Sequence, residues 1–174
     1  VDYDAQQELR EILSRFIALG HRRIGVLCPT KTSVPGYYAR LKLDYIDTLF
    51  GHDIVLNPNL YWRFLDTGDE EAIARTIREW LQMPEAPTAI FSWSPAFIKV
   101  AQELIHELPN RTISLAGSGY LYEKDLPVSG FVMPHRECGN ELVYGLRETI
   151  KNPFHIVQKL IPCQFVDRGT IHSA

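Results

Sequence analysis

The stretch Phe16-Ile-Ala-Leu-Gly-His-Arg-Arg-Ile-Gly-Val-Leu27 decides the fold, because it reads as the end of a helix followed at once by a buried strand. Before it, Leu9 and Leu13 belong to an apolar stripe at helical spacing. Gly20 then occupies a position where a left-handed residue ends a helix, since glycine enters that conformation without a Cβ clash. Residues 24–27 are apolar throughout, which is typical of a parallel strand covered on both faces. We therefore expect half of a right-handed β-α-β crossover here.

The same alternation of helix and strand continues along the chain. Asp4, Thr67 and Ser94 are the expected N-caps of three helices, each followed by a periodic apolar pattern. One helix is expected over about 37–50, and the others begin after Asp4, Thr67 and Ser94 and at Pro134. The expected strands cover 1–3, 24–27, 54–56 with 60–62, 88–91, 112–116, 129–133 and two short pieces within 158–171. The sequence therefore predicts a parallel-sheet α/β domain with three layers, helix on sheet on helix.

Composition narrows the range of functions. The 174 residues are 45% hydrophobic and 22% charged, which is typical of a globular chain. The formal charge of −3 provides no basic field for a nucleic-acid backbone, and no apolar run approaches the ~20 residues of a membrane helix. Cys28, Cys138 and Cys163 are odd in number and far apart, which favours reduced thiols and a cytoplasmic protein.

Catalytic and metal-binding motifs are absent from the sequence. Gly117-Ser-Gly119 lacks the third glycine of a dinucleotide fingerprint, so we interpret it as a turn. We interpret His21 as a residue at the negative end of a helix dipole rather than as a base. The acidic residues around Asp69 fit a helix N-terminus better than a carboxylate pair. We therefore predict no catalytic residue, no metal and no cofactor.

Five short stretches, in this order, resemble one protein family. They are Val1-Asp2 with Ala18-Leu-Gly-His-Arg-Arg-Ile-Gly25, Pro87-Thr-Ala-Ile-Phe91, Ile113-Ser-Leu-Ala-Gly117, Met133-Pro134 followed by Gly139, and Leu160-Ile-Pro-Cys-Gln-Phe-Val-Asp-Arg-Gly-Thr170. Each stretch is weak alone, but the ordered set resembles the effector-binding region of LacI/GalR-type transcriptional regulators. That region has a periplasmic-binding-protein-like fold, and the resemblance spans nearly the whole chain.

The resemblance implies a larger protein than these 174 residues. Such regulators carry a DNA-binding headpiece and then a sensor of two α/β lobes around a cleft. Residues 1–132 and about 158–174 would form the second lobe, and about 133–157 would return toward the first. Because the chain opens on Val1-Asp2-Tyr3 without an initiator Met, we expect a piece of a longer protein that lacks the headpiece and most of the first lobe.

The family's effector site can be carried over position by position. Tyr3 falls where the family often has an aromatic residue or Asn, and Arg40 lies within about one residue of a usual Arg. Trp62 is the nearest candidate for an aromatic residue before the third helix. Trp93 follows a predicted strand and fits either the pocket or the core, Trp62 fits either edge packing or a ligand platform, and Arg40 fits either the site or an exposed helix face.

Three polar positions depart from the family pattern. Ser94 stands in place of an Asn-Asp pair, Gly119 in place of a ligand-binding Asp, and Met133 in place of a Gln. A site that recognises hydroxyl groups loses much of its discrimination when such hydrogen-bonding partners are absent. We therefore predict that the chain alone binds no common monosaccharide tightly, and that either the effector is no typical pentose or hexose or the pocket has changed its use.

The resemblance also implies a homodimer. The family pairs through the helix after the Thr-Ala strand and through the loop after Gly117, and here these segments carry surplus apolar residues, which often mark an interface. The candidates are Phe97, Ile98, Ala101, Ile105, Tyr120, Leu121 and Tyr122. The alternative is an ordinary wide core face on that helix.

The sequence thus predicts the small-molecule-sensing and dimerising region of a transcriptional regulator. A sugar-like or other metabolite would shift lobe closure and so operator affinity, with DNA contacted only through a headpiece outside these residues. One alternative is a solute-binding protein of an ABC importer, which shares the fold; the pattern Val166-Asp-Arg-Gly-Thr170 and the unpaired cysteines argue against it. A second is an enzyme on an α/β scaffold, for which the sequence offers no convincing acid, base or nucleophile.

Overall fold

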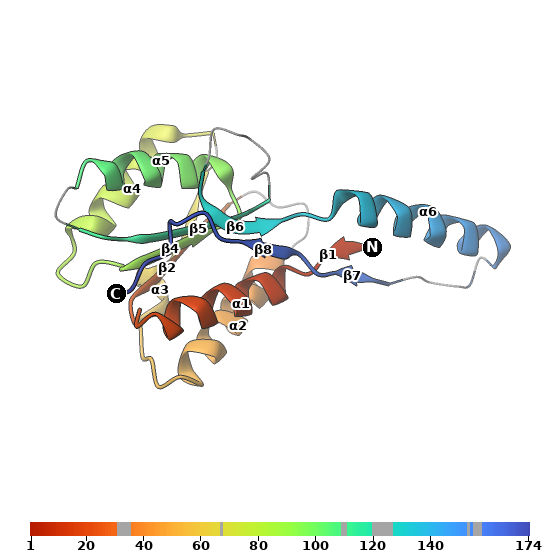
Figure 1. Ribbon diagram of the computed structural model, residues 1–174, viewed down its shortest axis with the longest axis horizontal. Helices are drawn as coiled ribbons and strands as arrows, with labels where there is room; N and C mark the ends of the chain where they lie inside the picture. The colour runs from red at the N-terminus through yellow and green to blue at the C-terminus, as the bar shows by residue number, and fades with distance from the viewer. Residues whose placement is uncertain (31–35, 67, 109–110, 120–126, 153, 155–157) are drawn as a thin grey trace.

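The computed structural model is a mixed α/β structure (Figure 1) that describes residues 1–30, 36–66, 68–108, 111–119, 127–152, 154 and 158–174. Its elements are β1 Asp2–Tyr3, α1 Ala5–Ala18, β2 Ile24–Pro29, α2 Tyr37–Phe50, α3 Pro58–Tyr61, β3 Trp62–Leu65, α4 Glu70–Gln82, β4 Ala89–Ser92, α5 Pro95–His106, β5 Ser114–Gly119, β6 Ser129–Val132, α6 His135–Lys151, β7 Leu160–Ile161 and β8 Gln164–Val166. The order of these elements confirms the predicted alternation of strands and helices.

The main sheet has six strands in the order β3-β2-β4-β5-β6-β8. The first five are mutually parallel, and β8 runs antiparallel beside β6 at the edge. Strands β1 and β7 form a separate parallel pair outside this sheet. Because parallel strands end at a common edge, the residues that follow β2, β4 and β5 meet on one side of the molecule, where open α/β sheets place their ligands.

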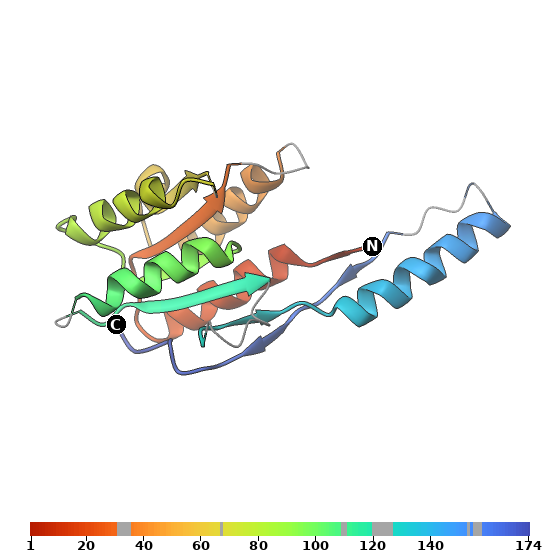
Figure 2. The same cartoon turned by 90° about the horizontal axis from the view of Figure 1, so that it is seen from above.

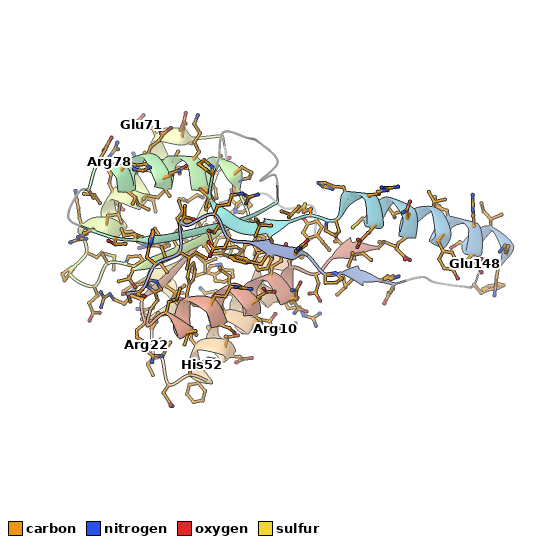
Figure 3. The ribbon with its side chains drawn as sticks, viewed as in Figure 1. Arg10, Arg22, His52, Glu71, Arg78 and Glu148 are labelled. Atoms are coloured by element: carbon orange, nitrogen blue, oxygen red, sulfur yellow. The ribbon has the colours of Figure 1, made fainter. Side chains whose placement is uncertain are left out.

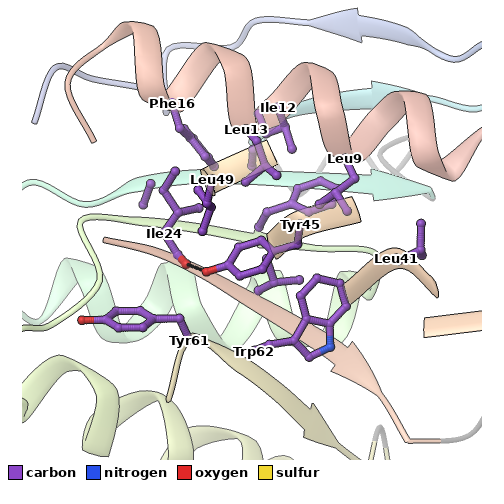
Figure 4. Packing of buried hydrophobic residues seen from close by; sticks show 14 of the residues in the cluster. Leu9, Ile12, Leu13, Phe16, Ile24, Leu41, Tyr45, Leu49, Tyr61 and Trp62 are labelled. Carbon is purple, nitrogen blue, oxygen red and sulfur yellow. Dashed lines mark hydrogen bonds between the residues drawn. The ribbon is translucent and has the colours of Figure 1, made fainter. Parts of the chain in front are cut away.

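Helices cover both faces of the sheet (Figure 2). On one face, α1 and α2 bury an apolar cluster against the side chains of β2, with Leu9, Phe16 and Tyr45 fully buried. Figure 4 shows this packing, in which the Tyr45 hydroxyl donates a 2.8 Å hydrogen bond to the Ile24 carbonyl oxygen. On the other face, α4 and α5 enclose a second cluster around Ile77 and Trp80. The two clusters confirm the predicted three layers.

The helix ends agree with the sequence analysis only in part. Asp4 caps α1 by accepting a 2.9 Å hydrogen bond from the Gln7 backbone N–H, and Gly20 has the expected positive φ of 92°. The prediction was wrong for α4, which is capped by Asp69, whose side chain accepts from the backbone N–H of Ala72, while Thr67 lies outside the described residues. Ser94 is the N-cap residue of α5 but makes no side-chain capping bond.

The predicted edge strand lies in a different place. Residues 54–56 form no strand, because Asn57 and Pro58 begin the short helix α3, with the Asn57 side chain accepting from the Asn59 N–H. The strand follows at β3, where Trp62 is buried, Arg63 and Leu65 are half-buried and Phe64 is exposed. Trp62 and Phe64 lie on the same face of the strand, so this face opens toward the end of β3.

His21 follows the C-terminal end of α1, as predicted, with its backbone N–H bonded to the Phe16 carbonyl oxygen, and it is also part of the core. Its side chain is 1% exposed, with Nδ1 2.9 Å from Thr88 Oγ1 and Nε2 2.8 Å from the His172 carbonyl oxygen. Nε2 carries a proton, because the His172 carbonyl oxygen can only accept. Burial, ahead of other effects, lowers the pKa of His21. His21 therefore joins α1, the sheet and the C-terminal segment.

Helix α6 extends away from the main sheet, with the β1–β7 pair beside its base (Figures 1 and 2). Figure 3 shows Glu148 near its far end, remote from Arg78 and Glu71 on α4. Its apolar side chains face solvent: the most exposed are Tyr144 at 57%, Leu146 at 63% and Ile150 at 81%. An apolar helix face without a packing partner is typical of an interaction surface.

Candidate ligand-binding site

Aromatic side chains gather where β3 and β4 end and α2 begins. The Tyr38 ring lies 5.9 Å from the ring of Trp93 and 6.3 Å from that of Phe64, measured between centroids. Tyr37 packs edge-on against Tyr38 at 5.2 Å. Tyr37, Tyr38 and Trp93 are each partly buried against the first core cluster, and Phe64 is 46% exposed. The edge of the sheet thus presents a continuous aromatic surface.

A buried carboxyl group lies beneath Trp93. The Trp93 Nε1–H donates a 3.0 Å hydrogen bond to Oε2 of Glu8 on α1, and the Ser118 hydroxyl on β5 donates a second at 2.8 Å. Burial raises the pKa of Glu8, and hydrogen bonds from Cys163, Ser118 and Trp93 oppose that rise. These bonds fix the indole of Trp93 in place and leave the Ser118 hydroxyl turned inward.

A pocket of about 170 Å³ opens between β1 and the start of α2. Tyr3 and Arg40, two of the predicted site residues, both line it, and Tyr37 and Leu41 form the wall of α2. Burial, followed by the nearby Tyr3 and Asp2, raises the pKa of Tyr37, so its hydroxyl stays protonated and can donate a hydrogen bond at neutral pH.

Three other predicted site residues are buried. Trp62 is 2% exposed and packs between Tyr45 and Trp93, at centroid distances of 5.3 and 6.2 Å, so it belongs to the core and the platform interpretation is wrong (Figure 4). Ser94 and Met133 are 6% and 8% exposed, which leaves little of either for a ligand. Gly119 is the last residue of β5.

The sequence analysis missed four residues of this region. They are Glu8, Tyr37, Tyr38 and Phe64. The adjacent Tyr37 and Tyr38 at a helix start, directly after the strand-tip loop, were the available signal. Glu8 was passed over because a Glu in a helix is usually exposed.

The predicted interface residues on α5 are mostly core. Phe97, Ile98 and Ala101 are at most 1% exposed and belong to the second cluster, so their side chains are unavailable to a partner and the alternative of a wide core face applies. Ile105 is partly buried against the same cluster. The remaining candidates, Tyr120, Leu121 and Tyr122, lie outside the described residues. Pairing through this loop stays a prediction.

Within the described ranges, no group of three or more His, Cys, Asp or Glu side chains is arranged to hold a metal ion. No helix in that part of the chain has the length and apolar character needed to cross a bilayer. The three cysteines are free, as predicted.

The structure is similar to solved regulators. A LacI regulator of Bacillus cereus subsp. cytotoxis superposes with a TM-score of 0.82 at 20% identity over 99% of this chain and 62% of that one. The chain has the fold of the LacI-family transcriptional regulators. A sugar-binding LacI-family regulator of Escherichia coli, complexed with phosphate, gives 0.75 at 19% identity over 99% and 63%. One from Enterococcus faecium with bound ribose gives 0.75 at 17% over 99% and 65%.

This chain with a LacI-type fold therefore spans less than two thirds of the length of those structures. No protein-family model matches it, and no curated protein sequence does.

Proposed function

We propose that this chain is the effector-sensing region of a LacI/GalR-type transcriptional regulator. The observation that carries the proposal is the superposition over 99% of the chain on such regulators, together with a pocket lined by Tyr3 and Tyr37 at the start of α2, the helix that follows β2. A small molecule at this edge would favour one arrangement of two lobes and so change the spacing of DNA-binding headpieces.

The domain boundaries are part of the proposal. Residues 1–132 and about 158–174 form one lobe, and about 133–157 belong to the approach to another lobe. The exposed apolar side chains of α6 support this division, because Leu146 and Ile150 need a covering surface that the described residues do not provide. Two copies of the lobe would form a homodimer, with operator DNA bound through a separate headpiece.

The described part of the chain contains one hydrogen-bonded pair of Ser and His side chains, and the geometry of that pair argues against an enzymatic function. His21 Nε2 lies 2.9 Å from Ser114 Oγ, a distance typical of a catalytic dyad. However, that nitrogen donates its proton to the His172 carbonyl oxygen and cannot take one from Ser114. Both side chains are also buried, with Ser114 at the start of β5, and neither lines the pocket between β1 and α2. The pair therefore holds the fold together.

The solute-binding alternative predicts a different partner. An importer component binds its ligand without binding DNA, so selection of genomic DNA fragments by the gene product that contains this chain separates the two functions. We expect enrichment of one short palindromic sequence and a change in its affinity when a metabolite binds. A product that enriches no sequence and remains monomeric in analytical ultracentrifugation would contradict the proposal.

A further inference from the structure

The pocket between Tyr3 and Tyr37 also indicates which class of ligand it accepts. Building on the proposed effector role, we propose that it takes one flat aromatic ring that bears a carbonyl or carboxylate group. The pocket volume of about 170 Å³ is close to that of a cavity, about 150 Å³, that is known to hold one benzene molecule. The space that the residues of this chain bound would hold one ring rather than the several rings of a typical drug-sized ligand.

The walls of the pocket favour a flat, apolar face. Tyr3 from β1 and Tyr37 from α2 line it from two different elements, and Ala5 and Leu41 complete the apolar part. Tyrosine rings prefer offset or edge-on contact with another aromatic ring and gain energy beyond the area they bury. The same rings offer few hydrogen bonds to the hydroxyl groups of a saturated sugar.

Three polar residues of the lining each make a hydrogen bond within the chain. Asp4 accepts from the Gln7 backbone N–H, Asp2 accepts from the Tyr3 backbone N–H, and the Gln6 amide donates to Asp44 at 2.6 Å. A carboxylate can accept more than one hydrogen bond, so these bonds do not by themselves exclude hydroxyl groups. The preference for a flat ring rests on the apolar walls of the pocket.

Arg40 is the cationic residue of the lining. Its side chain is exposed, and within the described residues its guanidinium group makes no hydrogen bond or ion pair. A guanidinium group binds a carboxylate or carbonyl oxygen in its plane. Arg40 therefore orients the ring by its polar substituent, while Tyr3 and Tyr37 bind the ring face.

The test compares four probes that differ in one property each. Benzoate and benzamide carry the flat ring with and without charge, cyclohexanecarboxylate replaces it with a puckered ring, and ribose is the sugar. Binding is measured by ligand-observed saturation-transfer NMR on this chain and on Tyr37→Leu, Tyr37→Phe and Arg40→Gln. Phe50→Leu, at an exposed site at the far end of α2, is the matched control.

We expect benzoate to bind about fivefold more tightly than cyclohexanecarboxylate, and Tyr37→Leu to weaken it by a similar factor. Tyr37→Phe and Phe50→Leu should leave it unchanged, and Arg40→Gln should weaken it about tenfold. Equal binding of the flat and puckered rings, tighter binding of ribose, or no binding of either aromatic probe overturns the inference. Ribose binding that Tyr37→Leu abolishes would overturn it while leaving the proposed effector function intact.

Discussion

Trp93 Nε1 donates a 3.0 Å hydrogen bond to Oε2 of Glu8, a carboxyl group fully buried 85 positions earlier in the chain. This bond connects the edge of the sheet to α1, and it holds the indole at the boundary between the core and the aromatic surface. An ionisable group without exposure is costly to charge, so the bond also makes the edge of the sheet sensitive to pH.

Glu8→Gln should therefore change how stability depends on pH. Burial raises the pKa of Glu8 above its ordinary value of 4.5, so between the two values the native state binds more protons than the unfolded state. The contribution of Glu8 to stability thus rises as the pH falls through the folded-state pKa toward 4.5, and is lost as the pH rises. Gln cannot titrate and removes this slope. The measurement is urea unfolding of both proteins from pH 4.5 to 8; parallel stability curves would exclude the assignment.

His21 should show the opposite slope in a different pH range. Its pKa is lowered below 6.5, so stability is full above that value and falls as the pH drops from 6.5 toward the folded-state pKa. His21→Ala leaves the Thr88 and Ser114 hydroxyls without their ring partner, and should cost about 2–4 kcal/mol at pH 7.5 and less at pH 5.5.

The control for this prediction is His172→Ala. His172 has an exposed side chain, and its contribution to the network comes from its backbone N–H and carbonyl groups. The substitution should change stability by less than about 0.5 kcal/mol. Hydrogen exchange at the His172 amide, which donates to Ser114 Oγ, should accelerate in His21→Ala and not in the control. Unchanged exchange in both variants would show that His21 does not hold the C-terminal segment.

The parts of this structure that follow from the sequence are those set by neighbouring residues. The stripe Leu9, Leu13 and Phe16 requires a helix with one buried face, and Gly20 requires its end, whatever the rest of the chain does. Glu8 lies in the same helix, but its partners Trp93 and Ser118 are 85 and 110 positions away. Helical spacing puts Glu8 on the buried face with Ala5 and Ile12, but no local pattern could show which partners its carboxyl group has there.

Only part of the candidate binding site could be predicted from the sequence, for the same reason. Tyr3 and Arg40 were carried over from the family resemblance, and both line one pocket, Tyr3 at the end of β1 and Arg40 in the first turn of α2. For Trp62 the choice between packing and platform stayed open, because its two neighbours, Tyr45 and Trp93, close over it only in three dimensions. An aromatic residue at a strand start gives no sequence signal that separates a covered ring from an open one.

Gly25→Ala tests how closely α4 packs on the sheet. A Cβ atom added at Gly25 would lie 2.7 Å from Cζ3 of Trp80, which is fully buried and fixed by a 2.7 Å hydrogen bond to the Leu60 carbonyl oxygen. The ring cannot shift without breaking that bond, so the substitution should destabilise the chain by about 1–3 kcal/mol.

Gly139→Ala is the matched control for the Gly25 substitution. Gly139 lies in α6 and has nothing within 4 Å of an added Cβ atom, so alanine there should stabilise the chain by up to about 1 kcal/mol. Thermal unfolding of the two variants gives shifts of opposite sign. A Gly25→Ala variant as stable as the parent would mean that α4 and the sheet are further apart than the structure has them.

Leu146→Glu combined with Ile150→Glu tests whether the exposed face of α6 is an interface. The two residues lie four positions apart on one side of the helix and are 63% and 81% exposed, so charges there should change the stability of this chain by less than about 0.5 kcal/mol each. The double variant should bind less of a fluorescent hydrophobic dye, because the apolar patch is smaller.

In the gene product that contains this chain, the same charges would be buried unpaired against another lobe, and protease sensitivity around residues 133–157 should increase. Asn140→Glu is the control, because Asn140 is exposed on the same helix and the substitution adds a charge outside the apolar patch. It should change neither the dye binding nor the protease sensitivity. Equal protease sensitivity of the double variant and the Asn140→Glu control would show that α6 faces solvent in the larger protein too.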